Sequence, residues 1–184
     1  MAFKNKIILN PKTRNEIKFL QTSKDSDGKL LEMESTYFEN SKEPPPHYHP
    51  YQEEDFTVLS GEISIRINGR INILKQGESI HIPANTVHSM WNNSDNKTIV
   101  NWRVRPAMET EFMLETLIGL AKDGKTNEAG VPGLLQISLT ANKFSNVLRL
   151  DNPPFILQKI IFTLLSPLAI ALGCRAMYSK YIDR

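Results

Sequence analysis

Four residues between positions 47 and 88 have side chains and spacing that could hold a metal ion. His47 and His49 stand two residues apart, directly after Pro44-Pro45-Pro46. Residues two apart in a strand point to the same side, so both imidazoles can meet one point inside a barrel. Glu54 follows five residues later, and His88 comes from a distant segment. Three imidazoles and one carboxylate suit Fe²⁺, Mn²⁺, Ni²⁺, Cu²⁺ or Zn²⁺ better than Mg²⁺ or Ca²⁺. Such a set leaves coordination positions for water or substrate, as a catalytic site requires.

Glu54 lies five residues after His49, so in one continuous strand their side chains would point to opposite faces. A turn or a bulge near Pro50 would bring them to the same face, since bulges re-aim side chains next to active sites. Glu53 is the alternative carboxylate, but it lies on the opposite strand face, and the spacing to Gly61 favours Glu54. His81 lies between Ile80 and Ile82 and should point to the opposite strand face from them. It is expected at the surface or behind the ligands. A barrel that keeps these polar residues in its core without a metal is the alternative to the whole assignment.

The elements that must position these residues are short strands. Ile63, Ile65 and Ile67 alternate with polar residues, and Asn68-Gly69 follows at once. Asn-Gly between two alternating runs predicts a type I′ hairpin, because both central residues need positive φ. Many short strands at this spacing predict a sandwich or barrel up to about residue 107. Further strands are expected at 6–9, 17–21, 30–38, 56–59, 79–82, 87–92 and 98–105.

After Pro106 the apolar period becomes helical. One helix is expected around 112–121, with Gly124 just past its end, and a second at about 134–144. Asp151-Asn152-Pro153-Pro154 predicts the start of a third helix, interrupted near Ser166-Pro167 and ended by Gly173. We therefore expect a mainly β fold with two parts, a barrel over residues 1–107 and a helical extension over residues 108–184.

The chain contains two motifs: His47, His49, Glu54 and Gly61 form the first, and Gly77, Pro83, His88 and Asn92 form the second, GESIHIPANTVHSMWN. These motifs resemble those of the cupin superfamily. The resemblance covers roughly residues 30 to 105 and implies a double-stranded β-helix, or jelly-roll barrel, that is usually dimeric and holds its metal inside. One divalent transition metal is therefore expected, with Fe²⁺ or Mn²⁺ first and Zn²⁺, Ni²⁺ or Cu²⁺ as alternatives. Asn85 stands where the second motif usually has glycine, and asparagine tolerates a left-handed turn well.

Four further residues are expected near the metal as substrate contacts: Tyr51, Phe56, Met90 and Arg103. Met90 shares strand parity with His88, and Arg103 could clamp an anionic group. Core packing is the alternative for Phe56 and Met90, and a surface ion pair is the alternative for Arg103. Trp91 and Trp102 should point to the opposite strand face from their neighbours Met90 and Arg103. Both are expected to pack against the second sheet, the helical extension or a dimer partner.

The fold alone does not set the reaction, because it hosts oxygenases, isomerases, decarboxylases and non-catalytic binders. Our first hypothesis is a metal-dependent, oxygenase-like enzyme for a small organic molecule, in which Glu54 also accepts a proton. The second is a non-catalytic barrel that senses or stores a small molecule. A sugar or phosphosugar isomerase is a third, with Arg103 and Arg105 as phosphate clamps.

Composition limits the partners and the compartment. The formal net charge of +2, from 22 basic and 20 acidic residues, argues against a nucleic-acid partner. The single cysteine, Cys174, excludes an internal disulfide, and no signal peptide is evident, so we expect a cytoplasmic protein. The cupin resemblance implies a homodimer. The segment 155–172 is strongly apolar, but Lys159 and Pro167 disfavour a membrane span. We expect it to pack on the barrel or on a dimer mate, with contact to a membrane as the alternative.

Overall fold

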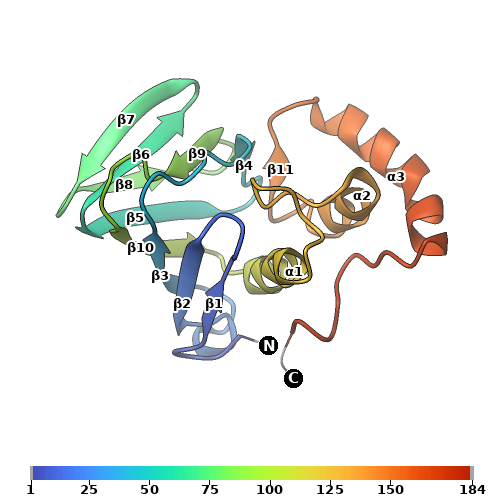
Figure 1. Cartoon of the computed structure of the whole chain (residues 1–184), viewed down its shortest axis with the longest axis horizontal. Coiled ribbons are helices and arrows are strands. Elements are labelled where there is room, and N and C mark those ends of the chain that lie inside the picture. The colour runs from blue at the N-terminus through green and yellow to red at the C-terminus, as the bar shows by residue number, and fades with distance from the viewer. Residues whose placement is uncertain (1, 183–184) are drawn as a thin grey trace.

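Two antiparallel sheets face each other in the computed structural model, which describes residues 2–182 (Figure 1). Every pair of neighbouring strands in them is antiparallel. The six-stranded sheet runs in the order β1 (Ile7–Leu9), β2 (Asn15–Gln21), β3 (Leu31–Tyr37), β10 (Thr98–Arg105), β5 (Glu53–Ser60) and β8 (Ser79–Ile82). The five-stranded sheet runs in the order β11 (Arg149–Leu150), β4 (His47–Tyr48), β9 (His88–Trp91), β6 (Glu62–Ile67) and β7 (Arg70–Lys75). The predicted mainly β fold with C-terminal helices is confirmed.

The alternation seen in the sequence places one apolar row between the sheets. Phe56 and Val58 of the six-stranded sheet meet Ile63, Ile65 and Met90 of the five-stranded sheet in one buried cluster. Burying these side chains contributes roughly 1.5–3 kcal/mol each to folding, so packing rather than a metal stabilises the barrel.

The turn predictions are also confirmed. Asn68 and Gly69 both have positive φ, at 46° and 83°, and join β6 to β7. Asn85 has φ 64°, so it takes the left-handed conformation expected in the place of a glycine.

Helix α1 (Thr110–Lys122) follows the barrel, and Gly124 with φ 69° ends it as expected. Its Ile118 joins the buried cluster formed by Phe19, Leu31 and Met33 of the six-stranded sheet. Helix α2 (Leu134–Lys143) comes next, close to its predicted bounds. Gln52 connects barrel and extension, because its side-chain amide donates to the Pro106 and Ala107 carbonyls at the end of the barrel and to the Thr110 hydroxyl of α1.

Helix α3 (Phe155–Ala171) differs from the prediction in two ways. It is one continuous helix with Pro167 inside, since the Ser166 hydroxyl donates to the Phe162 carbonyl instead of capping a new helix. It begins after Pro154 with no side-chain cap, and the Asp151 carboxylate accepts from the Asn152 side-chain amide instead of from the first turn of the helix. The helix packs on α2, at the end of the molecule far from β7 (Figure 1).

Candidate metal centre

The chain path brings the four predicted ligands together from both sheets. His47 on β4 lies directly opposite His88 on β9. His49 follows the end of β4, and Glu54 lies on β5 in the other sheet. The bend at residues 50–51 carries the chain from one sheet to the other and restores the inward parity of Glu54. The restoring feature is therefore the turn near Pro50 rather than a bulge within one strand.

Backbone carbonyls fix the orientation of all three imidazoles. The Nδ1 atoms of His47, His49 and His88 lie 3.1, 2.6 and 2.9 Å from the carbonyl oxygens of Pro45, Val147 and Thr86. A carbonyl oxygen only accepts, so each neutral imidazole must carry its proton on Nδ1. The Nε2 atom of each ring then has a free lone pair, which is the form that binds a metal.

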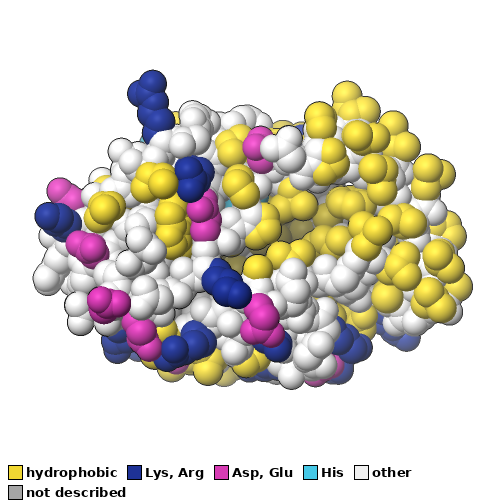
Figure 2. Space-filling view, turned by 45° about the horizontal axis from the view of Figure 1, so that its top comes forward, with side chains coloured by type: hydrophobic (Ala, Val, Ile, Leu, Met, Phe, Trp, Pro, Cys, Tyr) yellow, Lys and Arg dark blue, Asp and Glu magenta, His cyan; other side chains and the backbone are white. Residues whose placement is uncertain are grey.

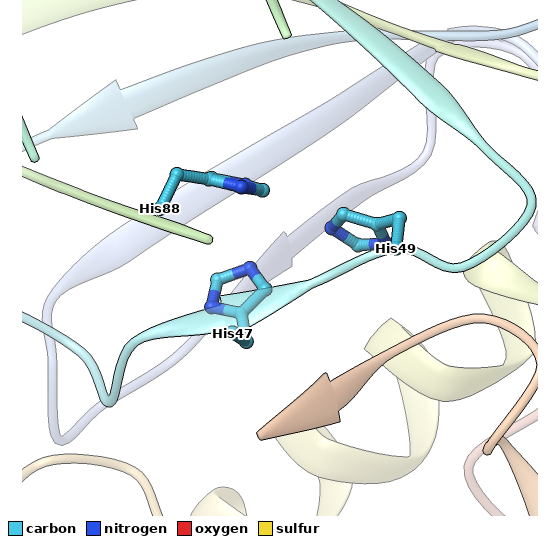
Figure 3. Close-up of side chains that lie close together, drawn as sticks. All are labelled: His47, His49 and His88. Atoms are coloured by element: carbon cyan, nitrogen blue, oxygen red, sulfur yellow. The ribbon is translucent and has the colours of Figure 1, made fainter. Parts of the chain in front are cut away.

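The rings converge on one point (Figure 3). The three histidines each offer a ligand nitrogen, and these atoms all lie within 4.8 Å of one another. Two nitrogens bound to one ion at 2.0–2.1 Å can be at most about 4.2 Å apart, so only small side-chain shifts are needed. The three-histidine cluster can therefore hold a metal ion.

Glu54 faces the same point. Its Oε2 atom lies 2.8 Å from His88 Nε2 and 3.3 Å from His49 Nε2. With its proton on Nδ1, a neutral His88 cannot donate from Nε2, so both Glu54 Oε2 and His49 Nε2 are buried without a hydrogen-bond partner among the described residues. A buried carboxylate oxygen and a buried imidazole nitrogen without donors cost free energy, and a cation between them removes that cost. Glu53, the alternative carboxylate, is exposed on the outer face of β5.

The close approach of these buried groups shifts the pKa values of Glu54, His47 and His88. Burial would raise the pKa of Glu54, but His49 and His88 outweigh it and lower the pKa to about 2. Burial, together with positive charge on His88 and His49, lowers the pKa of His47 to about 3. Burial also disfavours the charged form of His88, yet the Glu54 carboxylate outweighs this and raises its pKa. At neutral pH the centre thus holds an ionised carboxylate and a neutral His47.

Trp102 holds the other carboxylate oxygen. Its Nε1–H donates to Glu54 Oε1 at 2.9 Å, and its ring stacks on Phe56 with centroids 5.7 Å apart. Trp102 pairs with Phe56, and Val104 with Glu54, across the β10–β5 ladder, so all four face inward. Our sequence analysis missed this contact because it assigned the inward position on β10 to Arg103. The Oε2 atom of Glu54 is left to face the histidines.

The four predicted substrate residues occupy different places. Phe56 and Met90 are buried in the barrel core. Tyr51 is exposed, with the Arg149 guanidinium 5.9 Å from its ring centroid. Arg103 is turned to the outer face, where its guanidinium donates to Glu32 at 2.8 Å. The position expected for Arg103 beside the metal ligands is therefore corrected to the surface ion pair that was its alternative.

The sequence analysis also predicted positions for His81 and Trp91. His81 is at the outer face with Nδ1 2.8 Å from Asp55, as expected of a surface residue. Trp91 is buried in the five-stranded sheet, with the Arg66 guanidinium 5.5 Å from its ring centroid.

A small pocket lies beside Met90, and none of the four predicted metal ligands is part of its wall. Tyr37, Pro44 and Met90 contribute to its wall, and its volume is about 110 Å³. Burial and then the nearby Glu54 carboxylate raise the pKa of Tyr37 to about 12, against hydrogen bonds from Ser35 and Asn15 that lower it. The phenol therefore stays protonated at neutral pH.

The helical extension takes part in the centre. Strand β11 pairs with β4, so that Leu150 lies opposite His47, and the Val147 carbonyl just before β11 accepts from His49. No sequence signal points to Val147, because its backbone carbonyl is the group involved and it lies 98 residues from His49.

Similarity to curated proteins is local. The chain is 37% identical over 46 residues to oxidoreductase OpS7 of Beauveria bassiana and 44% identical over 43 residues to quercetin 2,3-dioxygenase of Bacillus subtilis. These matches cover 24% and 23% of the chain, but only 15% and 13% of the two relatives. The chain thus spans less than a sixth of either relative.

Two solved structures share the fold at low identity. One is an RmlC-like cupin from Shewanella frigidimarina, with a TM-score of 0.50 and 18% identity, over 60% of this chain and 94% of that one. The other is a predicted oxalate decarboxylase from Thermotoga maritima, with a TM-score of 0.50 and 18% identity, over 58% of this chain and 99% of that one. Residues 35–102 match the family described as the cupin domain. Residues 35–102 therefore form a cupin domain, which is followed by C-terminal helices.

Proposed function

We propose that this protein is a metal-dependent, oxygenase-like enzyme that acts on a small organic molecule. One observation carries the proposal. Backbone carbonyls orient three imidazoles so that their Nε2 lone pairs face the same space as Oε2 of Glu54, which has no hydrogen-bond partner among the described residues. Histidine and carboxylate donors suit Fe²⁺ or Mn²⁺, and they also accept Zn²⁺, Ni²⁺ or Cu²⁺. The partial likeness to a quercetin 2,3-dioxygenase and an oxidoreductase supports oxygenase-type chemistry.

The roles of the protein groups follow from their positions. A bound ion would supply a Lewis acid and, if iron, manganese or copper, a one-electron redox partner for a small molecule. Glu54 is ionised at neutral pH, so its Oε2 can accept a proton from a substrate hydroxyl. Trp102 keeps Oε1 occupied, which directs Oε2 toward the histidines. We place the substrate in the pocket beside Met90 and Tyr37.

The phosphosugar isomerase alternative loses its support. It required Arg103 and Arg105 as phosphate clamps, and both guanidinium groups instead pair with carboxylates on the outer face, those of Glu32 and Asp55.

The experiment that tests the proposal combines metal analysis with oxygen uptake. Untagged protein, expressed without added nickel or zinc, is analysed for metal by mass spectrometry and then assayed with flavonols and smaller phenols in an oxygen electrode. We expect about one metal ion per chain and oxygen consumption that His49→Ala and Glu54→Gln abolish. Stoichiometric metal without oxygen uptake would favour the non-catalytic sensor, and a metal-free wild-type protein that refuses added Fe²⁺ or Mn²⁺ would overturn the site itself.

A further inference from the structure

The outward face of α3 is apolar and uncovered. Its exposed residues include large side chains, among them Ile156 at 76% and Leu164 at 74% exposure. The helix buries only Gln158, Phe162 and Ala169, spaced so that they lie on one stripe, and it packs on α2. We call the uncovered side the α3 outer face. It comprises Ile156, Leu157, Ile160, Leu164, Leu168 and Ile170.

The α3 outer face is a convex ridge rather than a groove. At about 100° per residue, its six side chains spread over roughly half of the helix circumference. Figure 2 shows hydrophobic side chains gathered over the end of the molecule where Figure 1 places α3. A soluble surface that exposes a contiguous apolar patch of this kind marks an interaction site.

A second copy of the helix covers such a ridge poorly. A helix of 17 residues is about 25 Å long and about 10 Å across, so one partner helix can cover roughly 250 Å² of it. A stable protein interface buries about 800 Å² on each partner. A fluid apolar medium, by contrast, surrounds a convex ridge on all exposed sides.

The charged residues near the α3 outer face indicate which kind of apolar medium it contacts. From Pro153 through Ile182 the chain has no aspartate or glutamate, although acidic residues nearly balance basic ones in the whole sequence. Lys159 and Arg175 are exposed in this segment. Lysine and arginine next to an apolar helix face attract anionic headgroups, at about 1 kcal/mol each near the surface, while their stems lie along the apolar surface.

We propose that the α3 outer face docks on the surface of a membrane that contains anionic lipids. The helix would lie in the interface plane with its apolar side chains about 5–10 Å deep, as amphipathic surface helices do. It would not cross the membrane, because among residues 2–182 no helix has the length and apolar character to span a bilayer. The metal barrel, at the other end of the molecule, would remain in water.

The test measures binding of the full-length protein to vesicles by sedimentation. Vesicles of phosphatidylcholine and phosphatidylglycerol in equal parts are compared with pure phosphatidylcholine. We expect binding to the mixed vesicles, weaker binding to the neutral ones, and at least about tenfold weaker binding to both for Leu164→Glu, because an inserted leucine is replaced by a charge. Lys159→Gln with Arg175→Gln should remove the preference for the mixed vesicles alone.

Ile71→Glu is the matched control. Ile71 on β7 is 54% exposed, but it lies on the barrel far from α3, so the same chemical change should leave vesicle binding intact. Circular dichroism and light scattering on each variant separate loss of lipid binding from unfolding or altered assembly. No association of the wild type with either vesicle, or equal binding by Leu164→Glu and Ile71→Glu, overturns the proposal. A Leu164→Glu change that converts a dimer to a monomer, without any lipid binding by the wild type, assigns the ridge to a second copy instead.

Discussion

The hydrogen bond from Trp102 to Glu54 offers a direct test of how the barrel prepares its metal centre. Trp102→Phe removes the Nε1–H donor but keeps an aromatic ring next to Phe56. The variant leaves Glu54 Oε1 buried without a partner and free to rotate, so Oε2 is no longer held toward the histidines. The perturbation therefore acts on the metal ligand without removing any ligand.

The expected loss of stability and the expected loss of metal affinity are of similar size in free energy. A hydrogen bond to a charged group contributes about 1.5–3 kcal/mol, and a buried carboxylate oxygen without a donor costs a similar amount. Loss of a group that orients a metal ligand typically lowers metal affinity by about 10–100-fold. At about 1.4 kcal/mol per tenfold, this range corresponds to about 1.4–2.8 kcal/mol. We expect metal-free Trp102→Phe to lose about 1.5–3 kcal/mol in its free energy of unfolding at pH 7 and to bind metal about 10–100-fold more weakly.

The assay pairs chelator competition for metal affinity with urea unfolding followed by circular dichroism. Trp91→Phe is the matched control, because Trp91 is also buried but contacts the Arg66 guanidinium instead of Glu54. Both variants lose a similar volume, so both lose some stability. Only Trp102→Phe should lose metal affinity. Equal affinities for Trp102→Phe and the wild type, or an equal loss in Trp91→Phe, would refute the reasoning.

Three further predictions concern the ligands and the assembly. His49→Ala should lose most of its metal by mass spectrometry yet keep the circular dichroism spectrum of the wild type, because the buried apolar cluster stabilises the barrel; global unfolding of this variant would contradict that. Metal affinity should fall as the pH drops through the raised pKa of His88, because His88 must lose its proton to bind, whereas His47 stays neutral down to about pH 3; an affinity that does not change between neutral and mildly acidic pH would speak against this. The protein should form a homodimer that covers exposed sheet edges, and a monomeric mass at all concentrations in light scattering would count against it.

Local rules made much of the barrel predictable from the sequence. The isoleucine alternation at 63–67 and the Asn68-Gly69 turn fixed a hairpin, because side-chain period and backbone sterics act within a few residues. The same two-residue period gave the common facing of His47 and His49, and the spacing to Gly61 favoured Glu54 over Glu53. Gly124 and Gly173, both with positive φ, end their helices as expected for the same reason.

Local rules failed where the outcome depended on a competing long-range contact. The Asp151 backbone amide donates to the Pro46 carbonyl on the barrel, and α3 begins only after Pro154, so the Asp151 carboxylate does not cap it. Pro167 remains inside α3 although proline disfavours helix interiors, since α3 is held along one side by packing on α2. These two residues have strong local preferences that tertiary contacts outweigh.

The sequence by itself determined the candidate ligands and most of the strands around them. Only the tertiary structure decided which groups hold those ligands in place. Whether Trp102 or Arg103 reaches Glu54 depends on the register between β10 and β5, and a slip of one residue exchanges the two faces. The partner of His49 is the Val147 carbonyl, 98 residues away. Every residue has a carbonyl, so no side-chain pattern can identify the one that the fold brings to the site.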